Sequence, residues 1–501
     1  MAKGPGAPDP ELLSAMHFHQ SGRVADAEKK YLGYLSRFPN DPAARSQYGI
    51  LLSQSGRGFE AVDQFEIAVN ADPKSSVLRS YFAFSLRDAG LLEDAVEHFV
   101  EATRLDPKSP QNYFHLGNAL LKLNRFQEAI DTYVTCTKLE KTNFGAWLNL
   151  GLSHFRNSNY EEAILSYQKA RELNRNAASV WLNLGDAYLA LKDLEQAEKS
   201  YRKGLELAPQ DADGWANLGT AILEKGSANE AMDYLRKSLS LQPDAPKTRF
   251  EIARALHVLK RNSEAEAEYR TVLEKNPGLT IAAFNLGIVL ADQGKTSEAM
   301  QAFQSVSAIS DDSLAACAEV RSALLVPVIA RSQDEIQSYR EKVISKLNEL
   351  ISKKISIGDP QSQIGTPGFY LAYQGKNNRE LHCLIAQTMM HAVPDLVWTA
   401  PHIQKPRPNQ HRIRVAFISA HLKEHTVGRI TAGLIEHLDC TRFEVWVMRP
   451  SGSSDEFSRV IDKMADVAVE LPDDYRLARE VVGDKELDII YYPDIGMEPF
   501  T

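Results

Sequence analysis

The sequence has few cysteines and no long hydrophobic run. Its four cysteines lie far apart, at Cys136, Cys317, Cys383 and Cys440. This spacing fits neither a disulfide framework nor a zinc knuckle, and the pattern H-E-x-x-H is absent, so we expect a reducing compartment and no metal. No apolar run approaches a membrane span, and the N-terminal stretch MAKGPGAPDPELLSAM has no apolar core of signal-peptide length.

Net charge is also low for the length of the chain. A charge of −9 over 501 residues argues against general binding to nucleic acid or to anionic membranes. From the cysteine spacing and the lack of a signal-peptide core or membrane span, we expect a cytoplasmic protein, or a nuclear one if its host has a nucleus.

The sequence does contain a long internal repeat. Small residues recur at an unbroken interval of 34 residues, at Ala15, Gly49, Ala83, Gly117, Gly151, Gly185, Gly219, Ala253 and Gly287. Twelve residues after each comes an alanine, at Ala27, Ala61, Ala95, Ala129, Ala163, Ala197, Ala231, Ala265 and Ala299. Four residues later comes a large side chain, at Tyr31, Phe65, Phe99, Tyr133, Tyr167, Tyr201, Leu235, Tyr269 and Phe303. The small residues predict two helices that cross closely in each unit, with the large side chain filling the space between them.

The interval itself identifies the type of repeat. A period of 34 residues is that of the tetratricopeptide repeat, a helix–turn–helix unit that buries its apolar face only by stacking on its neighbours. Prolines end most of the second helices, at Pro39, Pro73, Pro107, Pro209, Pro243 and Pro277. We predict nine repeats from about residue 8, forming an α-solenoid over residues 1–313 that binds other proteins.

Residues 314–410 are predicted to join this solenoid to a different fold. Residues 314–357 have apolar side chains at helical spacing, and residues 358–369 are rich in Gly, Pro and Ser, which predicts a loop. A further helix is expected at 379–392, followed by an extended linker with Pro401, Pro406 and Pro408.

Residues 411–501 alternate strands with helices. Strands are predicted at Ile413–Ser419, Phe443–Met448, Asp466–Leu471 and Leu487–Tyr492. Helices are predicted at Arg429–Leu438, Asp455–Met464 and Tyr475–Val482. This alternation implies a parallel sheet with right-handed crossovers, half of a doubly wound α/β domain, whose last strand leaves an apolar edge.

Two strand ends carry candidate catalytic residues, because open parallel sheets bind ligands beyond the carboxyl ends of their strands. His425 follows the first strand at the start of a helix, where it could take or position a proton; alternatively it only caps or packs against the helix. Asp494 follows the fourth strand and could orient a hydroxyl or cap the next segment. No GxGxxG follows the first strand, so a dinucleotide cofactor is not expected.

Asparagines form a second candidate site within the repeats. Four of them lie two residues before a repeat glycine, at Asn149, Asn183, Asn217 and Asn285. Stacked amides at one position would form a ladder that grips an extended polypeptide by its backbone. Alternatively, they bond neighbouring helices or face water. Other residues interrupt the ladder, at Gln47, Tyr81, His115 and Glu251, and the neighbouring Trp147, Trp181 and Trp215 are assigned to the helix–helix core.

The order of repeats, helical segment and Rossmann-like lobe resembles the protein O-GlcNAc transferases, especially their bacterial branch. The resemblance covers almost the whole chain and is most specific in FYLAYQGKNNREL (369–381), PDLVWTAPH (394–402), IRVAFISAHLKEHTVGR (413–429) and LDIIYYPDIGMEP (487–499). The family motif after the first catalytic strand is usually Ser-x-Asp-Phe-x-x-His followed by a small residue or Pro, then often Val-Gly. This chain matches it at Ser419, His425, Thr426, Val427 and Gly428, and departs from it at His421 and Leu422, where Asp and Phe are common.

The resemblance implies an inverting glycosyltransferase that transfers GlcNAc from UDP-GlcNAc to Ser or Thr of proteins held by the repeats, without a metal or other cofactor. In the family, the histidine at the position of His425 lines the cleft and acts as a base or a positioning group. Residues 411–501 would be the first lobe of a two-lobed GT-B catalytic region, with the donor contacts in a second lobe and none in this chain. A homodimer is also possible within the family.

Two alternatives stay open at this point. The chain could be a natural, non-catalytic tetratricopeptide adaptor that binds the same clients. It could also be a relative that keeps the fold and transfers another sugar, fucose or glucose.

Overall fold

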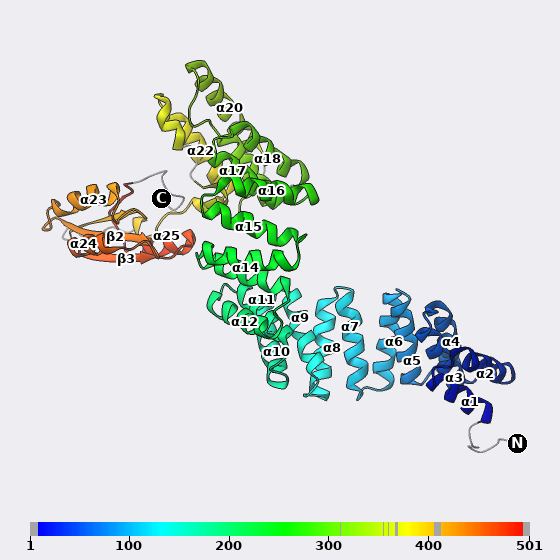
Figure 1. Ribbon diagram of the computed structural model, residues 1–501. Helices are drawn as coiled ribbons and strands as arrows, with labels where there is room; N and C mark the ends of the chain where they lie inside the picture. The colour runs from blue at the N-terminus through cyan, green and yellow to red at the C-terminus, as the bar shows by residue number, and fades with distance from the viewer. Residues whose placement is uncertain are drawn as a thin grey trace. The chain divides into compact units, whose positions relative to one another are not determined.

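The computed structural model describes residues 9–310, 312–353, 355–358, 360–365, 369–404 and 412–493 (Figure 1). The chain divides into two compact units, Met1–Pro243 and Asp244–Thr501. No helix in the described ranges is long and apolar enough to cross a membrane.

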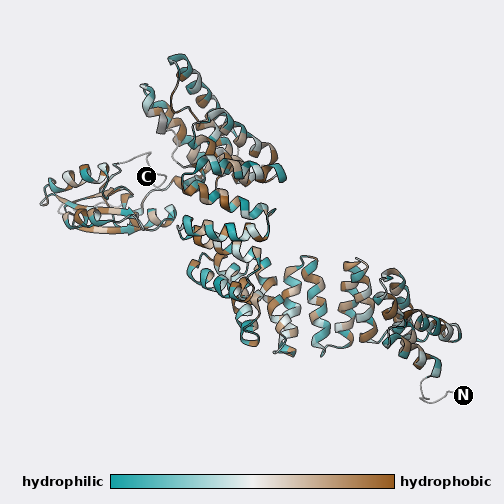
Figure 2. Ribbon diagram, in the orientation of Figure 1, coloured by the Kyte–Doolittle hydropathy of each residue, from teal (hydrophilic) through white to brown (hydrophobic). Residues whose placement is uncertain are grey.

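The first unit consists of antiparallel helix pairs. Its helices are α1 (Pro10–Gln20), α2 (Val24–Arg37), α3 (Pro42–Gln54), α4 (Gly58–Ala71), α5 (Ser76–Asp88), α6 (Leu92–Leu105), α7 (Pro110–Lys122), α8 (Phe126–Leu139), α9 (Phe144–Arg156), α10 (Tyr160–Leu173), α11 (Ala178–Ala190), α12 (Leu194–Leu207), α13 (Ala212–Glu224) and α14 (Ala228–Leu241). Hydrophobic and hydrophilic residues are interspersed along these helices, as expected for helices that bury one side (Figure 2). The predicted helical repeat fold is confirmed.

Two more helix pairs open the second unit, followed by a helical segment. The pairs are α15 (Pro246–Val258) with α16 (Asn262–Lys275) and α17 (Thr280–Asp292) with α18 (Thr296–Ile309). After them come α19 (Ser313–Leu324), α20 (Gln333–Ser352), α21 (Pro360–Ile364), η1 (Phe369–Gln374), α22 (Arg379–Ala392), η2 (Pro394–Leu396) and η3 (Pro401–Gln404).

This segment differs from the prediction in two places. Residues 314–357 are not continuously helical, because the chain leaves α19 after Leu324 and passes through Pro327, which cannot donate a helical hydrogen bond. The predicted loop 358–369 contains the short helix α21. The helix predicted at 379–392 is confirmed as α22, and it packs on α20.

Each repeat core depends on a large side chain packed against a small residue; this side chain is an aromatic ring in every predicted repeat except the one with Leu235. A Cβ atom built on Gly151 would lie 2.5 Å from the Tyr167 ring, and one on Gly185 would lie 2.6 Å from the Tyr201 ring. Both rings are buried almost completely. Glycine therefore lets the two helices of a pair approach until the ring touches backbone, as the spacing predicts.

The turn inside each helix pair has a conformational requirement that recurs with the same period. The positive-φ residues at this turn are Gly22, Gly56, Gly90, Asn124, Ser158, Lys192, Gly226, Lys260 and Gly294. Glycine adopts this left-handed conformation without strain, whereas Lys192 and Lys260 adopt it at a cost of about 1 kcal/mol.

The C-terminal part is a four-stranded parallel sheet with helices on both faces. Its elements are β1 (Ile413–Ile418), α23 (Thr426–Glu436), β2 (Phe443–Pro450), α24 (Glu456–Met464), β3 (Val467–Leu471), α25 (Tyr475–Asp484) and β4 (Ile489–Tyr491), with strand order β3-β2-β1-β4. Val415 and Phe417 pack with residues of α23 and α24, whereas Ala416 and Ile418 pack with Ala478 of α25. The parallel sheet is confirmed; its place as the first lobe of a GT-B enzyme stays a prediction.

We predict that Gly151→Ala destabilises the repeats by about 1–3 kcal/mol, because the added methyl group overpacks the Tyr167 ring. Urea unfolding followed by circular dichroism measures this change. Gly58→Ala is the matched control, since a Cβ atom there meets nothing within 4 Å at the start of α4. It should leave stability unchanged or raise it slightly; equal losses in both variants would contradict the packing argument.

Stability of the first unit is predicted to fall as the pH drops below about 6.5, the usual pKa of histidine. Burial lowers the pKa of His98, His115 and His154. These rings stay neutral in the folded chain while the unfolded chain binds protons, so acid favours unfolding until the folded pKa values are passed. Thermal melts at pH 7.5 and 5.5 test this. His115→Asn, which installs the residue found at the same position of later repeats, should reduce the pH dependence.

Candidate functional site

The four ladder asparagines lie on the first helices of four pairs, α9, α11, α13 and α17, but the fold uses them differently. Asn149 Nδ2 donates to Asn118 Oδ1 of the preceding pair at 2.8 Å. Asn217 Nδ2 donates to Asp186 Oδ1 at the same distance. These two amides therefore join neighbouring repeats, which is the structural alternative raised by the sequence.

Each acceptor also receives a hydrogen bond from the ring that packs on the repeat glycine. Tyr133 Oη donates to Asn118 Oδ1 at 2.6 Å, and Tyr201 Oη donates to Asp186 Oδ1 at 2.6 Å. Burial, reinforced by the Asp186 charge, raises the pKa of Tyr201, so its hydroxyl stays protonated and donates. A tyrosine, an acceptor and a ladder asparagine thus form one polar node.

Asn183 has a different environment. The residue that corresponds to Asn118 and Asp186 in the preceding repeat is Leu152, which offers no acceptor. Asn183 is half-buried, and no hydrogen bond of its amide is found within the described part of the chain. Asn285, in the second unit, faces the Tyr269 hydroxyl, and its amide partly offsets the rise that burial causes in the pKa of Tyr269.

The three tryptophans share one local contact. Trp147, Trp181 and Trp215 each donate their indole N–H to the backbone carbonyl six residues earlier, at 2.9, 2.8 and 3.0 Å. All three are only partly buried, and each hydrogen bond ties the ring to the loop before its helix.

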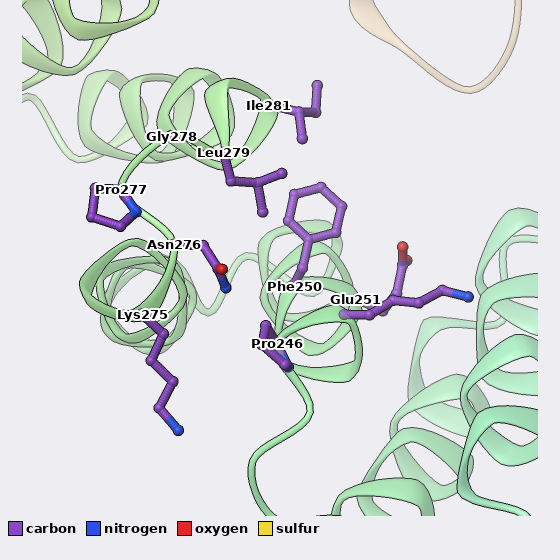
Figure 3. A pocket seen from close by; sticks show the side chains of 10 residues that line it. Pro246, Phe250, Glu251, Lys275, Asn276, Pro277, Gly278, Leu279 and Ile281 are labelled. Carbon is purple, nitrogen blue, oxygen red and sulfur yellow. The ribbon is translucent and has the colours of Figure 1, made fainter. Parts of the chain in front are cut away.

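The second unit contains a hollow beside Glu251, which replaces asparagine at the ladder position of this repeat (Figure 3). It has a volume of about 820 Å³ and lies between α15, the end of α16 and the start of α17. Phe250, Leu279 and Ile281 provide apolar walls, and Asn276 lies beside them. Glu251, at the ladder position, is largely buried and forms an ion pair with Arg254 at 2.7 Å. At this ladder position, a carboxylate paired with an arginine thus replaces the asparagine amide, and it lies beside an apolar recess.

His425 lies at the carboxyl end of β1, as predicted, and caps α23. Its backbone is extended, and its Nδ1 accepts a hydrogen bond from the Val427 backbone N–H at 3.2 Å. The helix therefore begins at Thr426, three residues earlier than the sequence indicates. Gly428 is required in this first turn, because a Cβ atom there would lie 2.1 Å from the Lys423 carbonyl oxygen.

The cap also constrains the chemistry of His425. Since Nδ1 accepts a hydrogen bond, the neutral ring carries its proton on Nε2. Nε2 can then donate to an oxygen atom, but it has no lone pair with which to accept a proton. The capping and functional interpretations are thus compatible, and this geometry favours a positioning group over a general base.

Sequence reasoning missed His421, which it treated as a departure from the family motif. The His421 and His425 rings stack with centroids 4.3 Å apart and planes inclined by 24°. The spacing H-x-x-x-H signals this pair only once the intervening loop is known to reverse direction. Leu422, the other departure, is fully buried with Phe417 and Ile435 and so takes a core position.

The remaining predicted features of the C-terminal part are Asp494, the segment PDLVWTAPH and the expected lack of a metal site. Asp494 lies outside the described residues, so its predicted role is untested. The segment PDLVWTAPH packs on α25, where Trp398 meets Gly483 and Asp395 pairs with Arg476 at 2.9 Å. Within the described ranges, no group of three or more His, Cys, Asp or Glu side chains is arranged to hold a metal ion.

Comparisons with known proteins concern the repeats. Tetratricopeptide-repeat family models match residues 85–124, 110–143, 148–212, 182–246 and 223–286. No curated protein is significantly similar to the chain.

Similar solved structures are also repeat proteins. MamA is 23% identical, with a TM-score of 0.32, and the match covers 34% of this chain and 92% of MamA. YrrB, a TPR protein with an unusual peptide-binding site, is 24% identical, with a TM-score of 0.34 and coverage of 39% and 97%. The C-terminal part of a TPR repeat-containing protein from Cytophaga hutchinsonii is 19% identical, with a TM-score of 0.42 and coverage of 48% and 99%. The family models thus identify tetratricopeptide repeats within residues 85–143 and 148–286, and the helix pairs of the fold continue on both sides of these matches.

Proposed function

We propose that this protein binds other proteins as extended polypeptides, which it grips by their backbone along the asparagine ladder. The observation that carries this proposal is the amide of Asn183, which lies half-buried on α11 and has no hydrogen-bond partner among the described residues. A primary amide offers two donors and an acceptor, which match a peptide N–H and C=O of any sequence. Asn149 and Asn217 bond the preceding repeat, so they stabilise the surface around Asn183 and contribute less to the affinity for the polypeptide.

This proposal predicts that Asn183→Ala weakens polypeptide binding about tenfold, the effect of losing roughly 1.4 kcal/mol, without lowering stability. Binding to an array of random-sequence peptides measures the effect across sequences. Asn149→Ala is the matched control: it removes an inter-repeat hydrogen bond, so it should cost about 1 kcal/mol of stability and change affinity less.

The reverse order would contradict the proposal. If Asn149→Ala weakened binding more than Asn183→Ala at equal stability, the amides that join the repeats would be the ones that contact the ligand. Unchanged binding in both variants would remove the ladder from the binding surface.

We propose as a second candidate that the C-terminal sheet is part of a glycosyltransferase that modifies the bound protein. The observation that favours it is the His421–His425 pair at the carboxyl end of β1. In the order β3-β2-β1-β4 the strand order reverses at β1, because β2 and β4 lie on opposite sides of it, and ligands of doubly wound sheets bind at such a switch point. His425 Nε2–H would hold an acceptor hydroxyl or a sugar oxygen there, with UDP-GlcNAc as the donor and no cofactor.

For this candidate, His425→Ala in the full protein should lower transfer from labelled UDP-GlcNAc about 100-fold, the usual cost of a misplaced reactant, without unfolding the chain. His437→Ala is the control, because its Nδ1 bonds the Gly433 carbonyl at the far end of α23. UDP-glucose and GDP-fucose as donors test the alternative sugars. Transfer from none of the three would leave the adaptor as the function, and equal transfer in both variants would remove His425 from the site.

A further inference from the structure

A second hollow lies in the first unit, between α8, α9 and α10. Its volume is about 460 Å³. Trp147, Leu150 and Leu173 supply apolar walls, and lysines supply part of its lining. We call it the Trp147 pocket. Trp147 and Asn149 are two residues apart on α9, about 200° around the helix, so this pocket lies on a different face from the ladder.

The ring of Trp147 is more open than those of the two equivalent tryptophans. Arg171 covers the Trp181 ring at 5.3 Å, and Tyr234 stacks on the Trp215 ring at 5.9 Å. No cation or aromatic ring covers Trp147 among the described residues, because Thr137 stands where the next repeat has Arg171. The indole N–H bond to the Lys141 carbonyl nevertheless fixes the ring in place. The pocket therefore offers a pre-positioned aromatic surface.

Three lysines add positive charge to this pocket. Lys169 pairs with Glu172 at 2.9 Å, whereas Lys138 and Lys141 are exposed and have no carboxylate partner in the described structure. This charge is not a general property of the repeat. Lys141 stands where six other repeats have proline, and the position of Lys138 is a glutamate in several later repeats, at Glu172, Glu206 and Glu274.

We propose that the Trp147 pocket docks an acidic segment of another protein, with an aromatic or large aliphatic side chain of that segment against Trp147. Two unpaired ammonium groups favour carboxylates in a chain whose overall charge is −9, and the uncovered ring favours an apolar anchor. The site does not depend on the ladder, so one partner can occupy it while a client is bound at the ladder.

The probe is a fluorescein-labelled peptide with aspartates on both sides of one phenylalanine, and the measurement is fluorescence anisotropy with the full chain. Binding should weaken with salt. The variant Lys138→Glu with Lys141→Glu should weaken it at least about tenfold. Lys203→Glu, at the position of Lys169 in the next repeat, should leave it unchanged. Equal affinity in all three proteins would overturn the proposal.

A further variant separates the apolar contact from the charge. Thr137→Arg copies Arg171 of the next repeat, so it should cover Trp147 while adding a positive charge. Weaker binding of the peptide supports an anchor on the indole ring, whereas stronger binding means that charge alone attracts the probe and overturns the proposed anchor. Preference for a labelled single-stranded oligonucleotide over the peptide would also overturn the choice of partner.

Discussion

The contact on which the repeat region depends is that between an aromatic ring and a small residue on the partner helix. In the pair formed by α7 and α8, the Tyr133 ring touches the backbone at Gly117, which sets the distance between the two helices. The same ring carries its hydroxyl across to Asn118, one residue further along. The Tyr133 side chain therefore links the core contact with Gly117 to the hydrogen bond between repeats. Any shift of its ring would also move Asn118, the acceptor that Asn149 uses in the next repeat.

This coupling explains why identical asparagines have different roles. An asparagine at the ladder position bonds the preceding repeat when that repeat offers Asn118 or Asp186, and it has no such partner when the repeat offers Leu152. Its availability for a ligand is therefore decided by a residue 31 positions earlier in the chain, not by its own identity or immediate neighbours. The sequence alone therefore overestimates the number of ladder amides that are available to bind a ligand.

Periodicity predicted the helix pairs, the ring that packs on glycine and the parallel sheet, because each follows from spacing within one or two elements. What it could not predict depends on contacts between elements or on local backbone geometry. The left-handed turn at Lys192 and Lys260 could not be recognised from the sequence, because no glycine marks the positive φ angle there. The start of α23 was misplaced because His425 supplies the cap through a ring nitrogen, which is not among the usual capping groups. The stacking of His421 on His425 likewise depends on the path of the loop between them.

Interruptions of the repeat pattern carry the functional information in this chain. The buried positions of a repeat must stay constant for the units to stack, so they say little about ligands. Where a repeat departs from its neighbours, the fold gains nothing obvious: Leu152 removes an inter-repeat hydrogen bond, and Lys141 replaces a proline that ends other repeats. Thr137 stands where the next repeat has Arg171, and it leaves the Trp147 ring uncovered. These positions lie within residues 137–152, on α8, α9 and the loop between them. Thr137 and Lys141 leave Trp147 of α9 open beside positive charge, whereas Leu152 leaves the amide of Asn183 on α11 without the acceptor that other repeats supply. Neighbouring repeats stack without these features, so two binding surfaces explain them better than stability does.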